Sequence, residues 1–205
     1  MDGSGASRVL FREEMPGDGK AQPSALAPAL LKDGKTLLYL RQTDSFGIST
    51  YSVPITGSSK PVKLIAPTSA KGSILNFQPS PDGRWIAYSS NESGRNEVYV
   101  VPYPDVTASK WQISSNGAQA PGWRGDSKEL YIFSLDQRLY AVPFDGSGSQ
   151  PRIGGPQPLF AIPNTAFNVF YNAAPDGKRF LVNRTPEQGS TPISLLINWP
   201  EDLRK

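Results

Sequence analysis

Short apolar stretches alternate with polar turns along most of this chain, and segment 76–102, NFQPSPDGRWIAYSSNESGRNEVYVVP, shows the pattern most clearly. Its turn, Ser80 to Gly83, combines a proline that presets φ, an aspartate that can bond its own backbone and a glycine that accepts positive φ. The apolar runs from Trp85 to Tyr88 and from Val98 to Val101 are strand-prone, and Pro102 ends the second because proline donates no ladder hydrogen bond. We therefore predict a strand, a tight turn, a second strand, a loop and a third strand.

This unit occurs four times in the chain. The aspartate of the turn reappears at intervals of 49, 44 and 50 residues, as Asp33, Asp82, Asp126 and Asp176. A Tyr-x-Val-Pro signature follows the first three turns, ending at Pro54, Pro102 and Pro143, and the fourth copy has degenerated to Leu195–Asn198. The offset from each aspartate to the end of its signature is 21, 20, 17 and 22 residues, so the two features travel together. A period of about 40–50 residues carrying four short strands is typical of one β-propeller blade.

The repeats predict an all-β fold, a β-propeller of four-stranded antiparallel blades. Four blades are recognisable, as a closed small ring or as a fragment of a larger one, and residues 1–205 form a single propeller domain or part of one. The predicted blades span residues 24–66, 73–115, 119–163 and 167–205. Residues 1–23 would supply an outer strand, Ser7 to Phe11, to a preceding or closing blade. Pairing of this strand with Ile193 to Trp199 would complete the fourth blade and cover two sheet edges.

The amino-acid composition excludes several kinds of metal site, catalytic mechanism and partner. The chain has 205 residues with no Cys and no His, which excludes disulfides, thiolate and imidazole metal sites, and Ser-His-Asp or Cys-His catalysis. It has no run of about 18 apolar residues, so we expect no membrane span. The net charge is +3, and the 21 Lys and Arg are scattered over turns rather than gathered in a stripe, so we expect no nucleic-acid partner. We also expect no cofactor, no metal and no catalytic constellation.

The turn motif resembles that of a known family. Ser80 to Arg84, Ser-Pro-Asp-Gly-Arg, and Pro175 to Lys178 match the mark of the Tol-Pal (TolB-like) family of WD-like propeller repeats, and Lys32–Lys35 and Gly125–Lys128 are weaker copies. The ending, from Pro192 onward, is similar to that of the C-terminal propeller of bacterial serine/threonine kinases. That similarity would place a kinase domain and a membrane helix upstream in a parent protein, and this chain in the periplasm or another extracytoplasmic compartment.

The resemblance implies a non-catalytic protein- or ligand-binding module, the sensor or interaction end of a bacterial serine/threonine kinase. Two alternatives stay open. The propeller of a prolyl-oligopeptidase-like or dipeptidyl-peptidase-like serine peptidase would accompany a Gly-x-Ser-x-Gly elbow and a His, which this sequence lacks. A propeller glycosidase or lyase would need paired carboxylates near the axis, whereas the glutamates here are sparse and lie in predicted loops.

Candidate site residues follow from position in the repeat. The aspartates of the turns occupy equivalent positions on different blades, so we expect them to cap turns rather than to form a metal or acid/base set. A protein or small-ligand partner would bind at one end of the propeller, where the loops 43–47, 91–96 and 134–137 lie. The candidate binding residues are Phe46, Arg95, Trp123, Phe170 and Tyr171, with ordinary core packing as the alternative for the aromatic ones.

Overall fold

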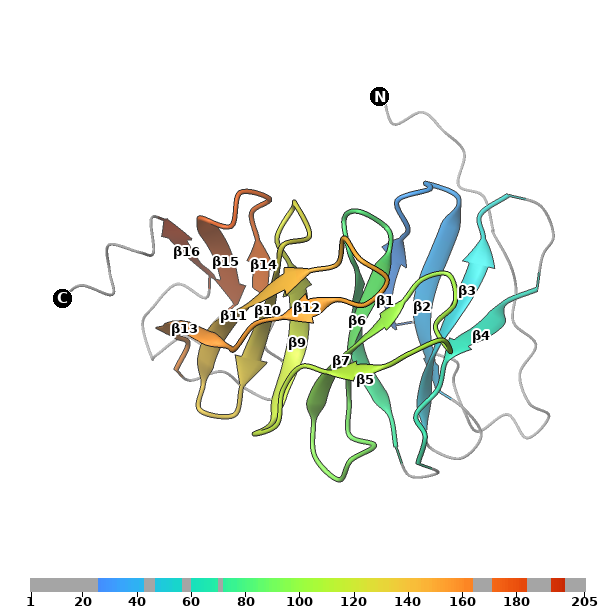
Figure 1. The fold of residues 1–205 in the computed structure, drawn as a ribbon, viewed down its shortest axis with the longest axis horizontal. Coiled ribbons are helices and arrows are strands. Elements are labelled where there is room, and N and C mark those ends of the chain that lie inside the picture. Colours follow the sequence, from blue (N-terminus) through green and yellow to red (C-terminus); the bar gives the residue numbers. More distant parts are fainter. Residues whose placement is uncertain are drawn as a thin grey trace.

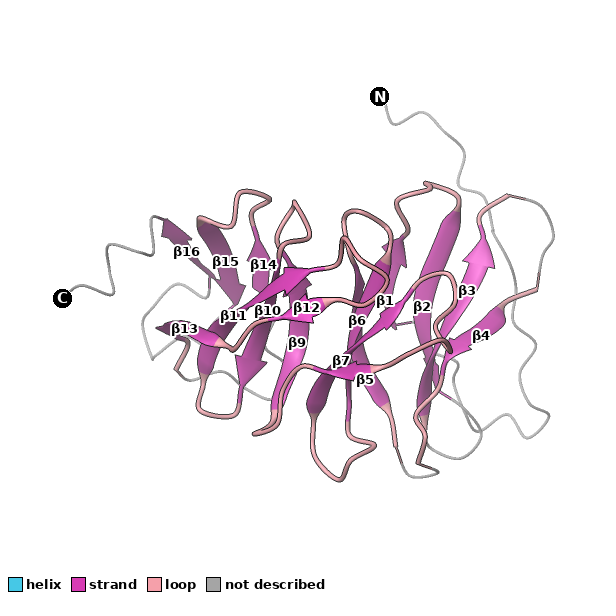
Figure 2. Ribbon diagram, viewed as in Figure 1, coloured by secondary structure: helices cyan, strands magenta, loops and turns pink. Residues whose placement is uncertain are grey.

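The structure is a computed structural model, and it describes residues 26–42, 47–56, 60–69, 72–163, 171–183 and 193–197. Every regular element in these ranges is a β-strand (Figure 2). The first sheet contains β1 (Leu26–Leu30), β2 (Thr36–Gln42), β3 (Ile48–Pro54) and β4 (Val62–Ile65). The second contains β5 (Ile74–Pro79), β6 (Trp85–Ser90), β7 (Glu97–Pro102) and β8 (Trp111–Gln112).

The third and fourth sheets differ slightly from this plan. The third contains β9 (Ala118–Trp123), β10 (Glu129–Ser134) and β11 (Arg138–Asp145), with both β12 (Arg152–Ile153) and β13 (Gln157–Ala161) paired to β11. The fourth contains β14 (Tyr171–Ala173), β15 (Arg179–Asn183) and β16 (Ile193–Ile197). All strand pairs are antiparallel, so the predicted all-β fold with four-stranded antiparallel sheets is confirmed.

The four sheets stand side by side in chain order, and each is one blade. Figure 1 shows the first blade at one end of the row and the fourth at the other, with the second and third between them. A closed four-blade ring would place the first and fourth blades next to each other, so the described blades have the arrangement of a partial propeller. The predicted closing strand, Ser7 to Phe11, lies outside the described residues.

Apolar residues on both faces of the second and third blades hold the row together. In β6, Trp85 and Ala87 belong to the core shared with the third blade, whereas Ile86 and Tyr88 belong to the core shared with the first. Successive residues of a strand point to opposite faces, so a single run of apolar residues supplies two interfaces. The strand β10 repeats the arrangement between the second and fourth blades. A blade cannot cover two apolar faces alone, which is why the blades stack.

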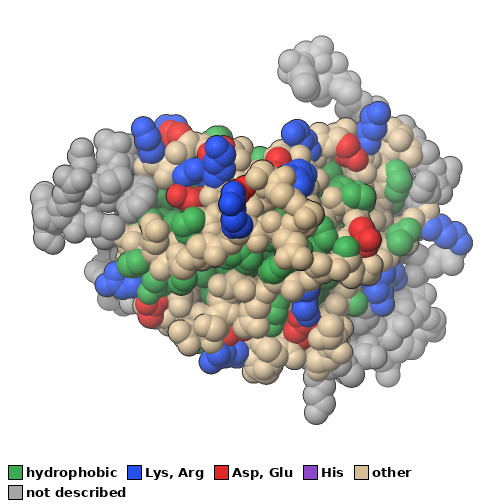
Figure 3. All heavy atoms as spheres, viewed as in Figure 1, with side chains coloured by type: hydrophobic (Ala, Val, Ile, Leu, Met, Phe, Trp, Pro, Cys, Tyr) green, Lys and Arg blue, Asp and Glu red, His purple; other side chains and the backbone are tan. Residues whose placement is uncertain are grey.

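The four repeated turns lie at one edge of the row, the upper edge in Figure 1, which we call the turn end. In each turn the aspartate Oδ1 accepts the backbone N–H of the residue two positions later, at 2.7, 3.1, 3.0 and 2.9 Å for Asp33, Asp82, Asp126 and Asp176. The prediction that these aspartates cap turns is confirmed. Figure 3 shows acidic and basic side chains mixed along this edge.

The turns also bond to one another across the blades. The Lys32 Nζ donates to the Asp82 carbonyl at 3.4 Å, and the Asp82 N–H donates to the Ser127 hydroxyl at 3.0 Å. The Gly125 N–H donates to the Pro175 carbonyl at 3.0 Å. Hydrogen bonds at the turn end therefore connect all four blades and fix their spacing.

Candidate binding site at the loop end

The opposite edge of the row, which we call the loop end, carries segments that differ from blade to blade. Three of them meet at the second and third blades: 91–96 after β6, 113–117 between β8 and β9, and 135–137 after β10. Of the predicted site residues, Arg95 lies here.

A buried carboxylate ties these segments together. The Glu97 residue, at the start of β7, is 1% exposed. Its Oε1 accepts the Arg95 Nε–H at 2.7 Å and the Gly117 N–H at 3.0 Å, and its other oxygen accepts the hydroxyl of Ser114. The same hydroxyl oxygen accepts the Val98 N–H at 2.9 Å. A buried charge is costly unless it is paired and hydrogen-bonded, so this network determines the shape of the loop end.

The guanidinium of Arg95 is both held and accessible. It donates through Nε to Glu97 and through Nη2 to the carbonyl of Ser115. Its side chain is nevertheless 56% exposed. An arginine fixed in this way presents its remaining donors in one orientation.

An exposed leucine stands on the same framework. Leu135 is 66% exposed, and its side chain lies over Gly117, where a Cβ would come within 2.3 Å of the leucine Cδ1. Gly117 has a φ of +86°, which also favours glycine. Its carbonyl accepts the Ser134 hydroxyl at 3.1 Å and the Leu135 N–H at 3.3 Å. The leucine is therefore presented by a supported loop and not by a free one.

A hollow of about 310 Å³ is lined by Gly117 and by Ser134 and Asp136, the residues on either side of Leu135 in the sequence. Ile113, Ala118, Ile132 and Pro156 contribute its apolar lining, and Ser114, Ser115, Asn116, Ser134, Asp136 and Tyr140 its polar side chains. The Tyr140 hydroxyl donates to Asp136 Oδ2 at 2.6 Å, and this hydrogen bond, together with partial burial, raises the pKa of the phenol. No group of three or more acidic side chains suited to a metal ion occurs among the described residues.

The other predicted site residues lie elsewhere. Trp123 is 5% exposed in the core between the second and third blades, and its Nε1–H donates to the Gln78 carbonyl at 3.1 Å. Tyr171 crosses from the fourth blade onto β9, where its hydroxyl donates to the Ala120 carbonyl at 2.9 Å and burial raises its pKa. Both aromatic residues hold neighbouring blades together. Phe46 and Phe170 lie outside the described residues.

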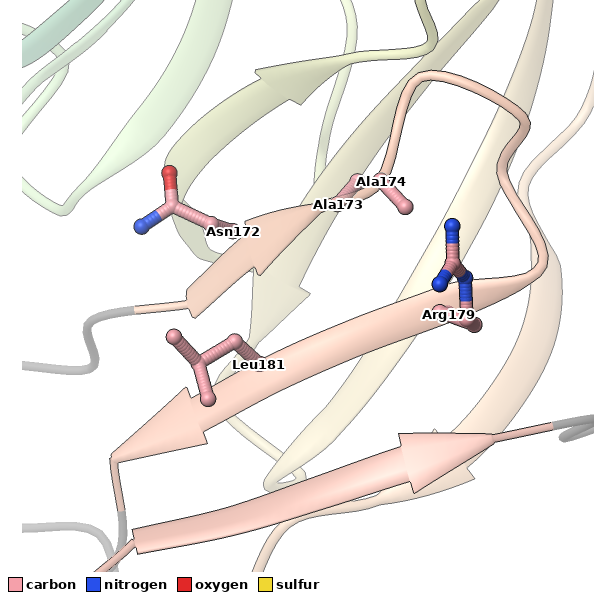
Figure 4. A pocket seen from close by; sticks show the side chains of 5 residues that line it. All are labelled: Asn172, Ala173, Ala174, Arg179 and Leu181. Atoms are coloured by element: carbon pink, nitrogen blue, oxygen red, sulfur yellow. The ribbon is translucent and has the colours of Figure 1, made fainter.

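A second hollow, of about 250 Å³, lies on the face of the fourth blade (Figure 4). It is lined by Asn172, Ala173, Ala174, Arg179 and Leu181. Leu181 is 45% exposed. It is an exposed leucine in β15, outside the three loop-end segments.

The similarity to known proteins lies in the fold. No family model and no curated protein sequence matches the chain. It superposes on TolB from Acinetobacter baumannii with a TM-score of 0.61 at 14% identity, covering 86% of this chain and 41% of that one. A structure assigned to TolB of Agrobacterium tumefaciens gives a TM-score of 0.53 at 15% identity, over 77% of this chain and 55% of that one. The fold is that of a TolB-like β-propeller.

Other propellers match this TolB-like fold as well. The β-propeller domain of Myceliophteria thermophila Cps50 (Swd1) gives a TM-score of 0.55 at 10% identity, over 80% of this chain and 53% of that one. The chain thus spans about half the length of the propellers that it matches. None of the described segments forms a helix with the length and hydrophobicity that a membrane crossing requires.

Proposed function

We propose that this TolB-like propeller is a non-catalytic module that binds a protein partner at the loop end of its second and third blades. One observation carries the proposal: Leu135 is 66% exposed, yet its N–H donates to the Gly117 carbonyl and its side chain lies over Gly117, a residue that lines a hollow. Exposed apolar side chains on a rigid support, next to an arginine, are typical anchors of protein interfaces. If this loop tip only had to be solvated, a polar residue would be favoured there.

The non-catalytic part of the proposal rests on chemistry. The sequence has neither His nor Cys, so carboxylates would have to act as acid, base or nucleophile. The aspartates of the turns cap their own backbone, and Glu97 accepts three hydrogen bonds within its network. Groups that are fully used in structural hydrogen bonds are poor candidates for proton transfer.

The proposed parent is a bacterial serine/threonine kinase, with this propeller as its sensor or interaction end. The support is the similarity of the segment from Pro192 onward to kinase-attached propellers. The coding sequence around this segment tests the idea. We expect His-Arg-Asp and Asp-Phe-Gly motifs and a membrane helix upstream. A downstream Gly-x-Ser-x-Gly elbow and His would instead favour the peptidase alternative.

Selection of random peptides displayed on phage tests the binding face. We would select against the wild-type chain and measure the affinity of the enriched peptides for Leu135→Ser and, as a matched control, for Leu181→Ser. The first variant should bind at least about tenfold more weakly, because it loses the apolar anchor. The control should bind as the wild type does. Equal affinities for all three proteins, or no enriched peptide, would overturn the proposal.

A further inference from the structure

Arg95 has hydrogen-bond donors available for a ligand group, and the proposed binding face does not yet assign such a group to it. A guanidinium has five N–H groups in a planar fork. One Arg95 donor bonds to Glu97 and one to the Ser115 carbonyl, which leaves three with no partner in the part of the chain that the structure describes. Because the buried Glu97 and a backbone carbonyl already fix the side chain, a ligand need not immobilise it.

The space next to these free donors is open. A hollow of about 370 Å³ is lined by Ser93, Gly94, Arg95, Glu97 and Gln112. Gly94 has a φ of +96°, and a Cβ built there would meet nothing within 4 Å. The loop thus turns sharply at a residue without a side chain, directly before the arginine, and leaves its outer face uncovered.

The charges here favour a singly charged oxyanion. A planar guanidinium binds carboxylates through paired N–H···O hydrogen bonds. Glu97 already offsets the charge of Arg95, and the nearby Glu92 is bound to Lys110 at 2.7 Å. A phosphate group, which carries about two negative charges, generally needs a cluster of arginines. A single carboxylate matches this site better.

The arginine and the exposed leucine belong to one framework. The Gly117 N–H donates to Glu97, which holds Arg95, and the Gly117 carbonyl accepts the Leu135 N–H. We infer that the loop end recognises a protein segment in which an aspartate or glutamate lies close to an aliphatic side chain, with the carboxylate on Arg95 and the aliphatic group on Leu135. This inference rests on the proposed function and specifies the chemistry of the partner.

The test uses the peptides enriched by the wild-type chain. Each acidic peptide is compared with its Asp→Asn or Glu→Gln form on the wild type, on Arg95→Lys and on the double variant Arg95→Gln/Glu97→Gln. The double variant removes both charges, so it leaves no unpaired buried carboxylate. Thermal melts establish whether each variant is folded. If the double variant does not fold, Arg95→Lys serves as the test, because it keeps Glu97 paired with a cation.

We expect the wild type to bind the acidic form at least about tenfold more tightly than the amide form. The preference should fall to about twofold or less in the double variant and to an intermediate value in Arg95→Lys, which lacks the fork. Leu135→Ser should weaken both forms of the peptide equally. Enriched peptides without acidic residues, or an acidic preference that persists in the folded variants, would overturn this inference and leave the binding face standing. The absence of any enriched peptide would overturn both.

Discussion

The turn end of this propeller repeats the same turn in every described blade, whereas the loop end differs from blade to blade. At the turn end the same aspartate recurs in every blade, and each one caps its own turn at 2.7 to 3.1 Å. At the loop end the segments differ, and the second and third blades share a network centred on Glu97 that no other described blade repeats. A residue that is repeated in every blade serves a function that every blade requires, and that function is structural. Residues that break the repeat are therefore the place to seek a partner.

The largest effect should come from a glycine at the turn end. Gly177 has a φ of +69°, and a Cβ there would lie 2.5 Å from the Tyr131 Oη and 2.8 Å from the Arg124 Cδ. Gly177→Ala combines an unfavourable backbone conformation with a clash between two blades, so the free energy of unfolding should fall by about 2–4 kcal/mol. Urea unfolding measures it. The control is Gly155→Ala, whose Cβ would meet nothing within 4 Å, with an expected change within about 0.5 kcal/mol. Similar losses in both variants would contradict the structural role of the turn.

A middle-sized effect should come from the carboxylate that joins the first two blades at the loop end. Glu92, with a side chain 4% exposed, accepts the Thr68 N–H and hydroxyl at 2.7 and 2.8 Å and the Lys110 Nζ at 2.7 Å. Glu92→Gln replaces charge-assisted hydrogen bonds with weaker ones, and it should lower the free energy of unfolding by about 1–3 kcal/mol at neutral pH.

The pH dependence of this effect has a definite sign. Burial raises the pKa of Glu92, but the hydrogen bonds from Lys110 and Thr68 outweigh burial and hold the pKa below the usual value of 4.5. The stabilisation is therefore complete above the usual value and is lost as the pH falls through the lower pKa of the folded state. The gap in unfolding free energy between wild type and Glu92→Gln should shrink in acid. A gap that stays constant with pH would show that the charge of Glu92 is unimportant.

The smallest effect should be a gain in stability. Thr50 is fully buried, and its hydroxyl has no hydrogen-bond partner among the described residues. The second and third blades place Val98 and Leu139 at this position, directly before the repeated tyrosine, and both are fully buried. Thr50→Val should raise the free energy of unfolding by about 1 kcal/mol, because it removes an unsatisfied polar group. A loss of stability would indicate that the hydroxyl has a partner that the repeat does not predict.

The repeat explains how much of the fold could be predicted. For the first blade the pattern predicts a third strand at Ile48–Pro54 and an outer strand at Val62–Ile65. The structure has both with these bounds, because proline and the turn residues set their ends. The repeat pattern predicts a single outer strand in the third blade, from Pro158 to Ile162, whereas the structure has two, β12 and β13, both paired to β11. The eight residues of β11 are long enough for two partners, a consequence of length that the spacing of motifs does not reveal.

The candidate site was harder to predict, because exposure depends on contacts between distant segments. The repeat predicts that Trp123 lies on the inner strand of the third blade, and it lies on β9, the innermost strand. Its indole bonds to Gln78 of the preceding blade, and neither periodicity nor composition indicates which neighbour an aromatic ring will reach. The loop that contains Leu135 was predicted to be part of the binding face, whereas the leucine itself was not. Its position over Gly117 is a tertiary contact that the repeat does not indicate.

The central claim is that the turn end stabilises the fold and the loop end binds the partner. Its most direct test is a paired measurement of melting temperature and peptide affinity on Asp82→Ala and Leu135→Ser. Asp82→Ala removes the acceptor for the Arg84 N–H and the Ser80 hydroxyl, so it should cost about 1–2 kcal/mol of stability, and binding below its melting temperature should be unchanged. Leu135→Ser should melt like the wild type and bind at least about tenfold more weakly. If instead the leucine variant kept full affinity, or the aspartate variant lost affinity while folded, the separation between a structural turn end and a binding loop end would be wrong.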